Sequence, residues 1–425
     1  MQWQNSHFLK TGSSMLSHIM EHCFFEDDIP YVNDFDEVIQ LFFPSIQKTE
    51  RIDLYIHIPF CAQICTYCKL KKKQLEAGDM EQYISLLEHQ AKKIFELYGK
   101  IQISAVWFGG GTPSLMSPAQ IRIVGDILYK YFNISSNYQH FFECHSTYLD
   151  TEKLQALKDI GINGLVIPTQ TTNSEVLKKH NRFSNNYFSK LENIVSEAKK
   201  MWFFVSTDII FGLKDNMLKD EIYAFLYAQN LDYDEISVYI LQKNTKISSL
   251  EELQFFVKNS AKLRAFLQTI PQFNQNYCLI GNTSERSTYY FRKNREVLDR
   301  YSPHIHTVWS ILTLGTGIFG GVFWKARFSC KDIKPYQDPK FHIFSIDMRY
   351  EMLEFFLWRL DLYGELLKSD FSKVFSAEIE MVFDKELKML HQQNIIRISE
   401  TKIELGSDSF IKNVDIFAKI FKYHG

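Results

Sequence analysis

The sequence predicts an α/β fold in which six strand–helix units form an incomplete, TIM-like (β/α)6 barrel over residues 51–245. Short β-branched runs, typical of buried strands, alternate there with longer stretches whose apolar residues recur at helical spacing. Such alternation is typical of a parallel sheet, and the closed barrel of this kind has eight units. The predicted strands are Ile52–Ile58, Ile103–Phe108, Tyr138–Glu143, Asn163–Ile167, Phe203–Ile209 and Glu235–Ile240. The predicted helices are Met80–Tyr98, Pro118–Phe132, Thr151–Asp159, Asn185–Lys200 and Met217–Gln229.

Three further segments complete the predicted domain organisation. Residues 1–50 are aromatic and acidic without a clear period, and we interpret them as an N-terminal extension. Residues 246–340 are interpreted as an extension of the barrel, and they contain the segment Thr313–Gly321, which we interpret as a glycine-rich loop. Residues 341–425 predict a C-terminal winged-helix-like domain, because helices and a small hairpin follow one another. Its predicted elements are helices Ile346–Tyr363, Ala377–Gln393 and Ser409–Phe421, and strands Ile395–Ile398 and Lys402–Leu405.

Composition and charge exclude several classes of protein. The net charge of −2 over 425 residues gives no sign of a nucleic-acid or membrane-surface binder, and acidic residues crowd helix 377–393. No apolar run reaches the roughly 18–20 residues that span a bilayer, and the N-terminus lacks the pattern of a secretory signal. Seven cysteines, three of them within eight residues, do not resemble a disulfide framework. We therefore expect a cytoplasmic protein with a metal site at the crowded cysteines.

Cys61, Cys65 and Cys68 form the most specific motif, with the spacing C-x3-C-x2-C directly after the first predicted strand. Iron–sulfur clusters are held by cysteine thiolates, usually four for a four-iron cluster. Three local thiolates would leave one iron open to a further ligand, which is a feature of a catalytic site. The alternatives are buried apolar cysteines or a structural zinc site, which would need a fourth ligand such as the nearby His57. The spacing favours the cluster.

Polar residues or glycines stand at the carboxyl ends of five predicted strands, where ligand sites form in parallel α/β folds. Cys61 follows the first strand, and Gly109–Gly111 follow the second. Glu143 ends the third, Gln170 lies just past the fourth, and Asp208 is near the end of the fifth. Because glycine lacks a side chain, the second of these turns allows backbone to approach a ligand closely. We expect the five strand ends to surround one site.

Together these motifs resemble the radical SAM family of oxygen-independent coproporphyrinogen III oxidase and its relatives, whose cofactor is S-adenosylmethionine (SAM). The resemblance is strongest in the stretch LYIHIPFCAQICTYC, which holds the three cysteines, and in Trp107–Ser114. It continues in the same order through Gly161–Gln170, His180–Arg182 and Thr207–Leu213. With the C-terminal domain it extends over about residues 51–425, and it implies a radical SAM barrel.

The resemblance also implies roles for individual residues. Cys61, Cys65 and Cys68 would bind a [4Fe-4S] cluster, and an electron from the cluster would cleave SAM to a 5′-deoxyadenosyl radical. Some members of the family bind a second SAM, and Gly315–Gly321 is a candidate wall for that space. The implied SAM contacts are Gly109, Gly110, Gly111 and Thr112 near the amino group, Gln170 and Asp208 at the ribose, Arg182 at the carboxylate, Glu143 at the amino or ribose region, and Tyr55 packing on the cofactor.

Departures from the family pattern bear on the substrate. Coproporphyrinogen oxidases of the family carry a further cysteine two positions after the third ligand, where this chain has Leu70. The related heme chaperones carry a His-Asn…Tyr-Trp motif that we do not find. The segment Ser284–Tyr289 resembles the anaerobic heme-utilisation branch, whose enzymes methylate heme. The favoured prediction is therefore a methyltransferase acting on heme or a related tetrapyrrole. The alternatives are oxidative decarboxylation of coproporphyrinogen III and a heme chaperone with little turnover.

The three hypotheses share their expected partners. Each requires a planar substrate or ligand, most simply a tetrapyrrole, and a reducing electron donor such as flavodoxin or ferredoxin. His304 and His306 are candidate contacts for the iron or a propionate of heme. The 36 phenylalanines and 22 tyrosines are numerous enough to line an apolar pocket as well as a core.

Overall fold

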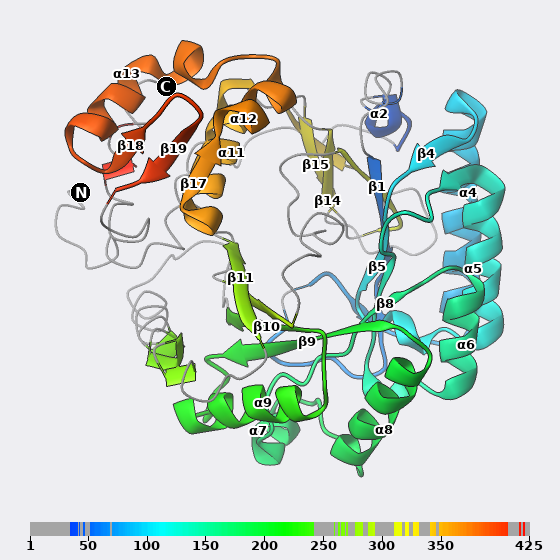
Figure 1. Ribbon diagram of the computed structural model, residues 1–425. Helices are drawn as coiled ribbons and strands as arrows, with labels where there is room; N and C mark the ends of the chain where they lie inside the picture. The colour runs from blue at the N-terminus through cyan, green and yellow to red at the C-terminus, as the bar shows by residue number, and fades with distance from the viewer. Residues whose placement is uncertain are drawn as a thin grey trace, which may run out of the picture. The chain divides into compact units, whose positions relative to one another are not determined.

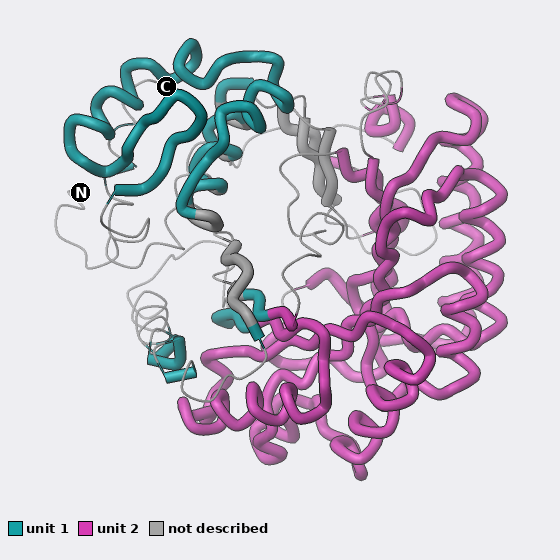
Figure 2. The backbone as a smooth tube through the Cα atoms, in the orientation of Figure 1, with its two compact units in different colours: residues 1–27, 238–291, 347–425 teal, residues 28–237, 292–346 magenta. Residues whose placement is uncertain are grey.

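The computed structural model describes residues 35–40, 52–68, 70–241, 277–283, 288–293, 310–316, 319–322, 326–330, 341–345 and 348–406, with runs of one to three residues elsewhere. The chain forms two compact units (Figure 2). One consists of residues 28–237 and 292–346, and the other of residues 1–27, 238–291 and 347–425. The boundary between residues 291 and 292 falls inside the predicted barrel extension 246–340, and the four-part division of the chain stays a prediction.

The larger unit is built on a mostly parallel sheet, as the strand–helix alternation predicted. Its barrel strands are β1 (Ile52–Ile58), β5 (Val106–Gly110), β7 (Phe141–Glu143), β8 (Gly164–Val166) and β9 (Phe204–Phe211), followed by β10 (Glu235–Ile240). The pairs β1–β5, β5–β7, β7–β8 and β8–β9 are all parallel. The α/β class and the partial barrel are therefore confirmed.

Helices form an outer layer around these strands (Figure 1). They are α4 (Asp79–Tyr98), α5 (Pro118–Tyr131), α6 (Thr151–Asp159), α7 (Ser174–Lys179), α8 (Tyr187–Lys200) and α9 (Leu218–Asn230). Their starts follow local chemistry: Ser117 and Gln120 form a reciprocal capping box before Pro118, and Asp150 caps α6 through the Lys153 amide. The short helix α7 was not predicted, because six residues carry little periodic signal.

The sheet continues beyond β1 in a direction that the sequence did not predict. The added strands are β13 (Ser310–Leu314), β14 (Phe319–Val322), β15 (Ala326–Cys330) and β16 (Phe341–Ser345), in that order from β1. β13 pairs with β1 in parallel, with Leu54 opposite Leu312. The prediction of a glycine-rich loop at Thr313–Gly321 was therefore wrong at both ends, which belong to β13 and β14. The glycines concealed the strand signal of the apolar residues beside them.

Gly315 ends β13 against helix α4. Its φ of 106° is in the left-handed region, and a Cβ there would lie 2.1 Å from the Tyr83 hydroxyl. The Gly315 amide donates to Gln90 Oε1 (2.7 Å), and the Thr316 amide donates to the Tyr83 hydroxyl (2.9 Å). Tyr83 in turn donates to the backbone carbonyl of His57 at 2.6 Å. These buried bonds fix the turn to α4 and β1, which gives Gly315 a structural role.

The end of the N-terminal extension packs against the same helix. Helix α2 (Phe35–Gln40) buries Phe35, Val38 and Ile39, and Asp36 pairs with Lys93 of α4 at 3.2 Å. The Phe35 ring also contacts the Phe341 ring of β16, with centroids 6.1 Å apart. Residues 1–34 lie outside the described part of the chain.

The C-terminal part of the smaller unit has the element order of a winged helix. It contains α11 (Met348–Tyr363), β17 (Glu365–Leu367), α12 (Lys368–Phe375), α13 (Ile379–Gln392), β18 (Ile396–Ile398) and β19 (Lys402–Leu405). The strands form one antiparallel sheet in the order β17-β19-β18. The predicted hairpin and first two helices are present, but β17 and α12 were missed. Most of the predicted helix Ser409–Phe421 lies outside the described residues.

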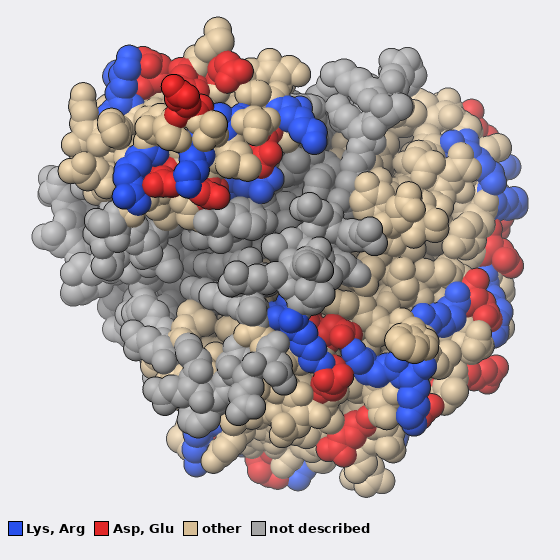
Figure 3. Space-filling view, viewed as in Figure 1, with Lys and Arg blue, Asp and Glu red and all other residues tan. Residues whose placement is uncertain are grey.

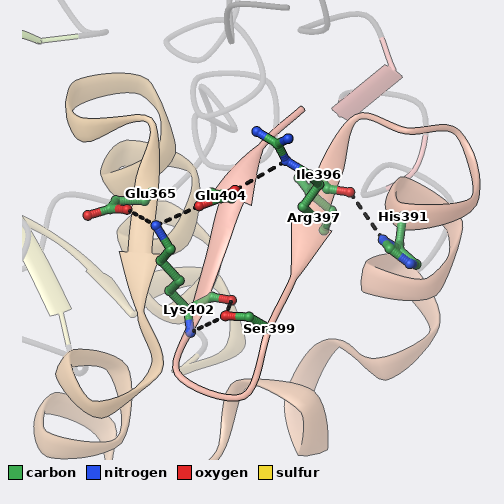
Figure 4. A network of polar contacts seen from close by, with 7 residues as sticks. All are labelled: Glu365, His391, Ile396, Arg397, Ser399, Lys402 and Glu404. Atoms are coloured by element: carbon green, nitrogen blue, oxygen red, sulfur yellow. Dashed lines mark hydrogen bonds and ion pairs between the residues drawn. The ribbon is translucent and has the colours of Figure 1, made fainter. Parts of the chain in front are cut away.

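The charges of the β18–β19 hairpin are paired with one another (Figure 4). Lys402 Nζ lies 2.8 Å from Glu365 and 2.6 Å from Glu404, and Arg397 Nε lies 3.2 Å from Glu404. On the face shown in Figure 3, basic and acidic side chains are interspersed in both coloured regions. The hairpin therefore presents balanced charge and not a basic stripe that would follow a phosphate backbone. Among the described helices, none has the length and hydropathy that a membrane span requires.

Candidate functional site

The three motif cysteines lie on one loop that leaves the carboxyl end of β1. Cys61 is buried in β2 (Phe60–Cys61), whereas Cys65 and Cys68 are half-buried on the turn that follows. Parallel pairing of β2 with β3 (Lys73–Gln74) closes the loop at its base. The Cys68 amide donates to the Cys65 carbonyl at 3.2 Å, which tightens the turn between them. All three thiols are free, as the motif required.

The pKa of Cys61 and the ligand requirements of each metal group indicate which group the three cysteines fit. Burial raises the pKa of the Cys61 thiol, and the neighbouring Cys68 and Cys65 thiolates raise it further, so the three sulfurs influence one another. Within the described residues, no three His, Cys, Asp or Glu side chains converge closely enough to hold one metal ion. A structural zinc site, with Zn–S bonds of about 2.3 Å, would need a fourth ligand beside the three thiolates. A four-iron cluster that leaves one iron open needs three thiolates, each at a different iron, so the three free thiols fit the cluster by their number and chemistry.

His57 is not available as a fourth ligand. Its Nε2 hydrogen-bonds to the Lys71 carbonyl at 2.9 Å, and its Nδ1 hydrogen-bonds to the Tyr55 hydroxyl at 3.1 Å. These partners fit a neutral imidazole that donates from Nε2 and accepts at Nδ1. Burial lowers the pKa of His57 to about 4, and the hydrogen bond to Lys71 only partly opposes this. His57 therefore supports the base of the cysteine loop as a neutral, hydrogen-bonded side chain.

We expect this histidine to make stability fall as the medium is acidified. The pKa of His57 drops from its ordinary 6.5 to about 4 on folding, so the unfolded chain takes up the proton first. Stability is thus complete above pH 6.5 and is lost as the pH falls toward 4, by about 3 kcal/mol from this group. Urea unfolding of the wild type and of His57→Gln across this window measures the difference in slope. His140 and His145, whose pKa values burial also lowers, are present in both proteins; equal slopes would contradict the assignment to His57.

The glycine turn, Gly109–Gly111, begins at the end of β5 and packs against protein atoms, which gives a further reason for its glycines. A Cβ on Gly109 would lie 2.8 Å from Glu143 Oε1, one on Gly110 would lie 2.7 Å from the His57 ring, and one on Gly111 would lie 2.5 Å from the Phe60 carbonyl. The glycines let β5 approach β1 and β2, whereas the sequence argument assigned their Cβ space to a ligand. The Thr112 amide donates to the Phe60 carbonyl (2.7 Å), and Thr112 Oγ1 donates to Cys61 Sγ (3.5 Å).

Glu143 lies beside this turn, at the end of β7. Its Oε1 accepts a hydrogen bond from Trp107 Nε1 at 2.9 Å. Tyr55 flanks the same point, because a Cβ on Gly109 would meet both Glu143 and Tyr55 Cε2, the latter at 3.0 Å. Three neighbouring strands thus bring Tyr55, Gly109 and Glu143 together, and of these the strand-end argument predicted Gly109 and Glu143 as neighbours. Their roles as SAM contacts stay predictions.

Gln170, which follows β8, meets Asp208, which lies inside β9 because that strand continues to Phe211 and not to Ile209 as predicted. The Gln170 amide donates to the Asp208 carbonyl at 2.7 Å, and Gln170 bridges to Ile209. Gln170 adopts a φ of 63°, a left-handed conformation that is costly for a residue other than glycine and that often marks a functional position. Its Oε1 is buried without a hydrogen-bond partner. A buried acceptor of this kind fits the hydroxyl of a bound ribose.

Arg182 lies against the cysteine loop. Its Nη1 is 4.0 Å from Cys65 Sγ, and its Nε is buried without a hydrogen-bond partner. The neighbouring residues fasten this segment to the loop: Thr66 Oγ1 hydrogen-bonds to His180 Nδ1 at 2.6 Å, and Asn181 Nδ2 donates to the Ile64 carbonyl at 3.4 Å. An orphaned buried donor on a cation fits a carboxylate ligand, which agrees with the role that the resemblance implied.

Sequence reasoning missed a buried histidine at the same strand ends. His145 comes two residues after Glu143, and its ring packs on Tyr148 and Tyr187, with centroids 5.2 and 5.9 Å away. Burial holds the pKa of His145 well below its ordinary value, and the nearby Arg182 cation lowers it further. His145 is therefore a neutral neighbour of Arg182. Its position directly after a strand-end glutamate was the signal that could have identified it.

By their contacts, the predicted site residues fall into two groups. Both groups lie at the cysteine loop and the strand ends. Contacts join Tyr55, Glu143, the glycine turn and Cys61 in one set, and Cys65 with Arg182 in the other. Gln170 and Asp208 are joined through their backbones. Gly315 faces α4 instead, so its part in a wall for a second SAM is not supported by its contacts. Ser284, His304 and His306 lie outside the described residues.

Comparisons with known proteins identify relatives of the chain. The family model of the radical SAM superfamily matches residues 55–226, which span the cysteine loop and the strand ends from β1 to β9. The heme chaperone HemW of Bacillus subtilis is 25% identical over 379 residues, which cover 85% of this chain and 97% of that protein. The oxygen-independent coproporphyrinogen III oxidase of Salmonella typhimurium is 25% identical over 50% of this chain and 46% of its own length.

A solved structure supports the fold as a whole. Coproporphyrinogen III oxidase from Escherichia coli, described as a radical SAM enzyme, superposes with a TM-score of 0.72 at 17% identity. The match covers 96% of this chain and 98% of that one, so it includes the C-terminal domain as well as the barrel. Residues 55–226 therefore form a radical SAM domain, and the chain has homologues named HemW and oxygen-independent coproporphyrinogen III oxidase.

Proposed function

We propose that the chain is a heme-binding radical SAM protein of the HemW type, with a [4Fe-4S] cluster at Cys61, Cys65 and Cys68 and SAM beside it. The observation that carries this proposal is the alignment with the Bacillus subtilis heme chaperone, which covers 97% of that protein. The structural support is the free cysteine triad at the mouth of a partial barrel whose neighbouring strand ends carry unpartnered polar atoms.

Different residues of the chain would bind different groups of this cofactor. Gln170 Oε1 would accept from a ribose hydroxyl, and Arg182 Nε would donate to a carboxylate, since both atoms are buried without a hydrogen-bond partner. Trp107 fixes the Glu143 carboxylate, which would then accept from an amino group. When bound, the cluster supplies the electron for reductive cleavage of SAM. The buried Cys61 and the closely packed glycine turn exclude water from that side of the site.

This proposal replaces the methyltransferase as the favoured function. The methyltransferase prediction depended on the short segment Ser284–Tyr289, most of which lies outside the described residues, and the comparisons support its alternatives better. Coproporphyrinogen oxidation is the second candidate, supported by the match to the Salmonella enzyme over half of this chain. Leu70 weighs against it, because the resemblance implies a cysteine there in that enzyme.

The test is made without oxygen on full-length protein with a reconstituted cluster. We expect absorbance titration with hemin to saturate at one heme per chain, and incubation with reductant and methyl-deuterated SAM to leave the mass of heme unchanged. His304→Ala with His306→Ala is expected to weaken heme binding, if that pair supplies the axial or propionate contact. Lys200→Gln, a change at an exposed ion pair with Glu197 on α8, serves as the matched control.

Each other outcome identifies a different function. Loss of carbon dioxide from coproporphyrinogen III, with formation of 5′-deoxyadenosine, would establish the oxidase. A deuterated, methylated tetrapyrrole would restore the methyltransferase. Absence of saturable heme binding by a protein with a complete cluster would overturn the HemW-type proposal.

A further inference from the structure

Two of the three cysteine sulfurs have a donor supplied by a distant part of the chain. Thr112 Oγ1 donates to Cys61 Sγ at 3.5 Å, from the turn after β5. Arg182 Nη1 lies 4.0 Å from Cys65 Sγ, from the segment after α7. Within the described residues, Cys68 Sγ has no such donor.

Both donors are held in place by backbone contacts to the cysteine loop itself. The Thr112 amide is bonded to the Phe60 carbonyl, one residue before Cys61. The Thr66 amide donates to the His180 carbonyl at 3.4 Å, two residues before Arg182. Each donor therefore moves with the sulfur that it faces. Such fixed partners around metal ligands orient the ligands and tune the metal.

We propose that Thr112 and Arg182 are positioning residues that raise the reduction potential of the cluster through Cys61 and Cys65. The inference goes beyond the contacts that the resemblance assigns to SAM, and it depends on the [4Fe-4S] cluster of the proposed function. Reduction adds one electron, taken from an external reductant, to an anionic group bound by thiolates. Donors to the sulfurs stabilise the added negative charge and so favour the reduced form. Arg182 raises the reduction potential more than Thr112 does, because its guanidinium carries a full positive charge in a buried setting.

The experiment measures the midpoint potential of the reconstituted protein by a redox titration monitored by electron paramagnetic resonance, without SAM. Omitting SAM separates this effect from the part of Arg182 in cofactor binding. We expect Thr112→Val to shift the potential to a more negative value and Arg182→Met to shift it further. Thr112→Ser and Arg182→Lys keep the hydroxyl and the charge, and we expect them to restore most of the wild-type value. Lys179→Gln is the matched control, since Lys179 is exposed and pairs with Asp215 at 2.6 Å.

Iron and sulfide content and the thermal midpoint of each variant establish that the cluster and fold are intact. Unchanged potentials in Thr112→Val and Arg182→Met, with full iron content, would overturn this inference alone. A shift of the same size in Lys179→Gln would also overturn the inference, because any cation near the surface would then be enough to raise the potential. A wild-type chain that assembles no four-iron cluster would overturn both the inference and the proposed function.

Discussion

Replacing Cys65 with alanine is expected to remove nearly all bound iron and sulfide and to abolish formation of 5′-deoxyadenosine. The three thiolates of Cys61, Cys65 and Cys68 are the whole local ligand set, and His57 is committed to Tyr55 and Lys71. Two remaining thiolates cannot retain a four-iron cluster that leaves one iron open. We expect activity to fall by at least about a hundredfold, more than the loss of an outer-shell contact causes.

The matched control is Cys144→Ala, which removes another buried, free cysteine next to the site. Burial raises the pKa of the Cys144 thiol well above its ordinary value, as expected for an inert thiol in the core. We expect Cys144→Ala to keep iron, sulfide and the absorbance of the cluster near wild-type levels. Wild-type iron content in Cys65→Ala would contradict the ligand assignment. Stoichiometric zinc without sulfide in the wild type would instead restore the structural alternative.

The cysteine site could be predicted because its signal is local in the sequence. The spacing of Cys61, Cys65 and Cys68 identifies a cluster without knowledge of the fold, and the strand ends then indicate which residues lie near it. The contact between Arg182 and Cys65 could not be predicted, because it joins residues 117 positions apart. The packing of the glycines at 109–111 against protein atoms could not be predicted either, since only the structure shows which atoms a Cβ would meet.

The difference between local and long-range signals also explains which strands could be predicted. The first and last barrel strands, Ile52–Ile58 and Glu235–Ile240, were predicted with their observed bounds because each is a continuous buried run. The strand β13 was missed because its pairing with β1 closes over about 250 residues and its end lies in glycine-rich sequence. β17 was missed because three residues carry no period. Long-range pairing and very short elements are decided by tertiary packing, which a local pattern does not contain.

We expect Gly315→Ala to lower the free energy of unfolding of the larger unit by more than an added methyl group at any glycine of the 109–111 turn would. The new Cβ would lie 2.1 Å from the Tyr83 hydroxyl and 2.8 Å from the His57 carbonyl, in a residue with a φ of 106°. We expect a loss of about 3 kcal/mol, from about 1 kcal/mol of backbone strain and up to about 3 kcal/mol of overpacking. Gly99→Ala is the control, because its φ is 68° and no atom lies within 4 Å of a Cβ there. Urea unfolding should show a loss of only about 1 kcal/mol for that variant.

A double-mutant cycle with Tyr83→Phe separates the clash from the strain. Tyr83→Phe alone removes hydrogen bonds to the His57 carbonyl and from the Thr316 amide, and should cost about 1–3 kcal/mol. In that background Gly315→Ala no longer meets a hydroxyl, so we expect it to cost less than in the wild type. It should still cost more than Gly99→Ala, because the His57 carbonyl remains 2.8 Å from the new Cβ. Strictly additive effects would show that the Tyr83 hydroxyl does not limit the space at Gly315 and that close packing on α4 does not fix the turn.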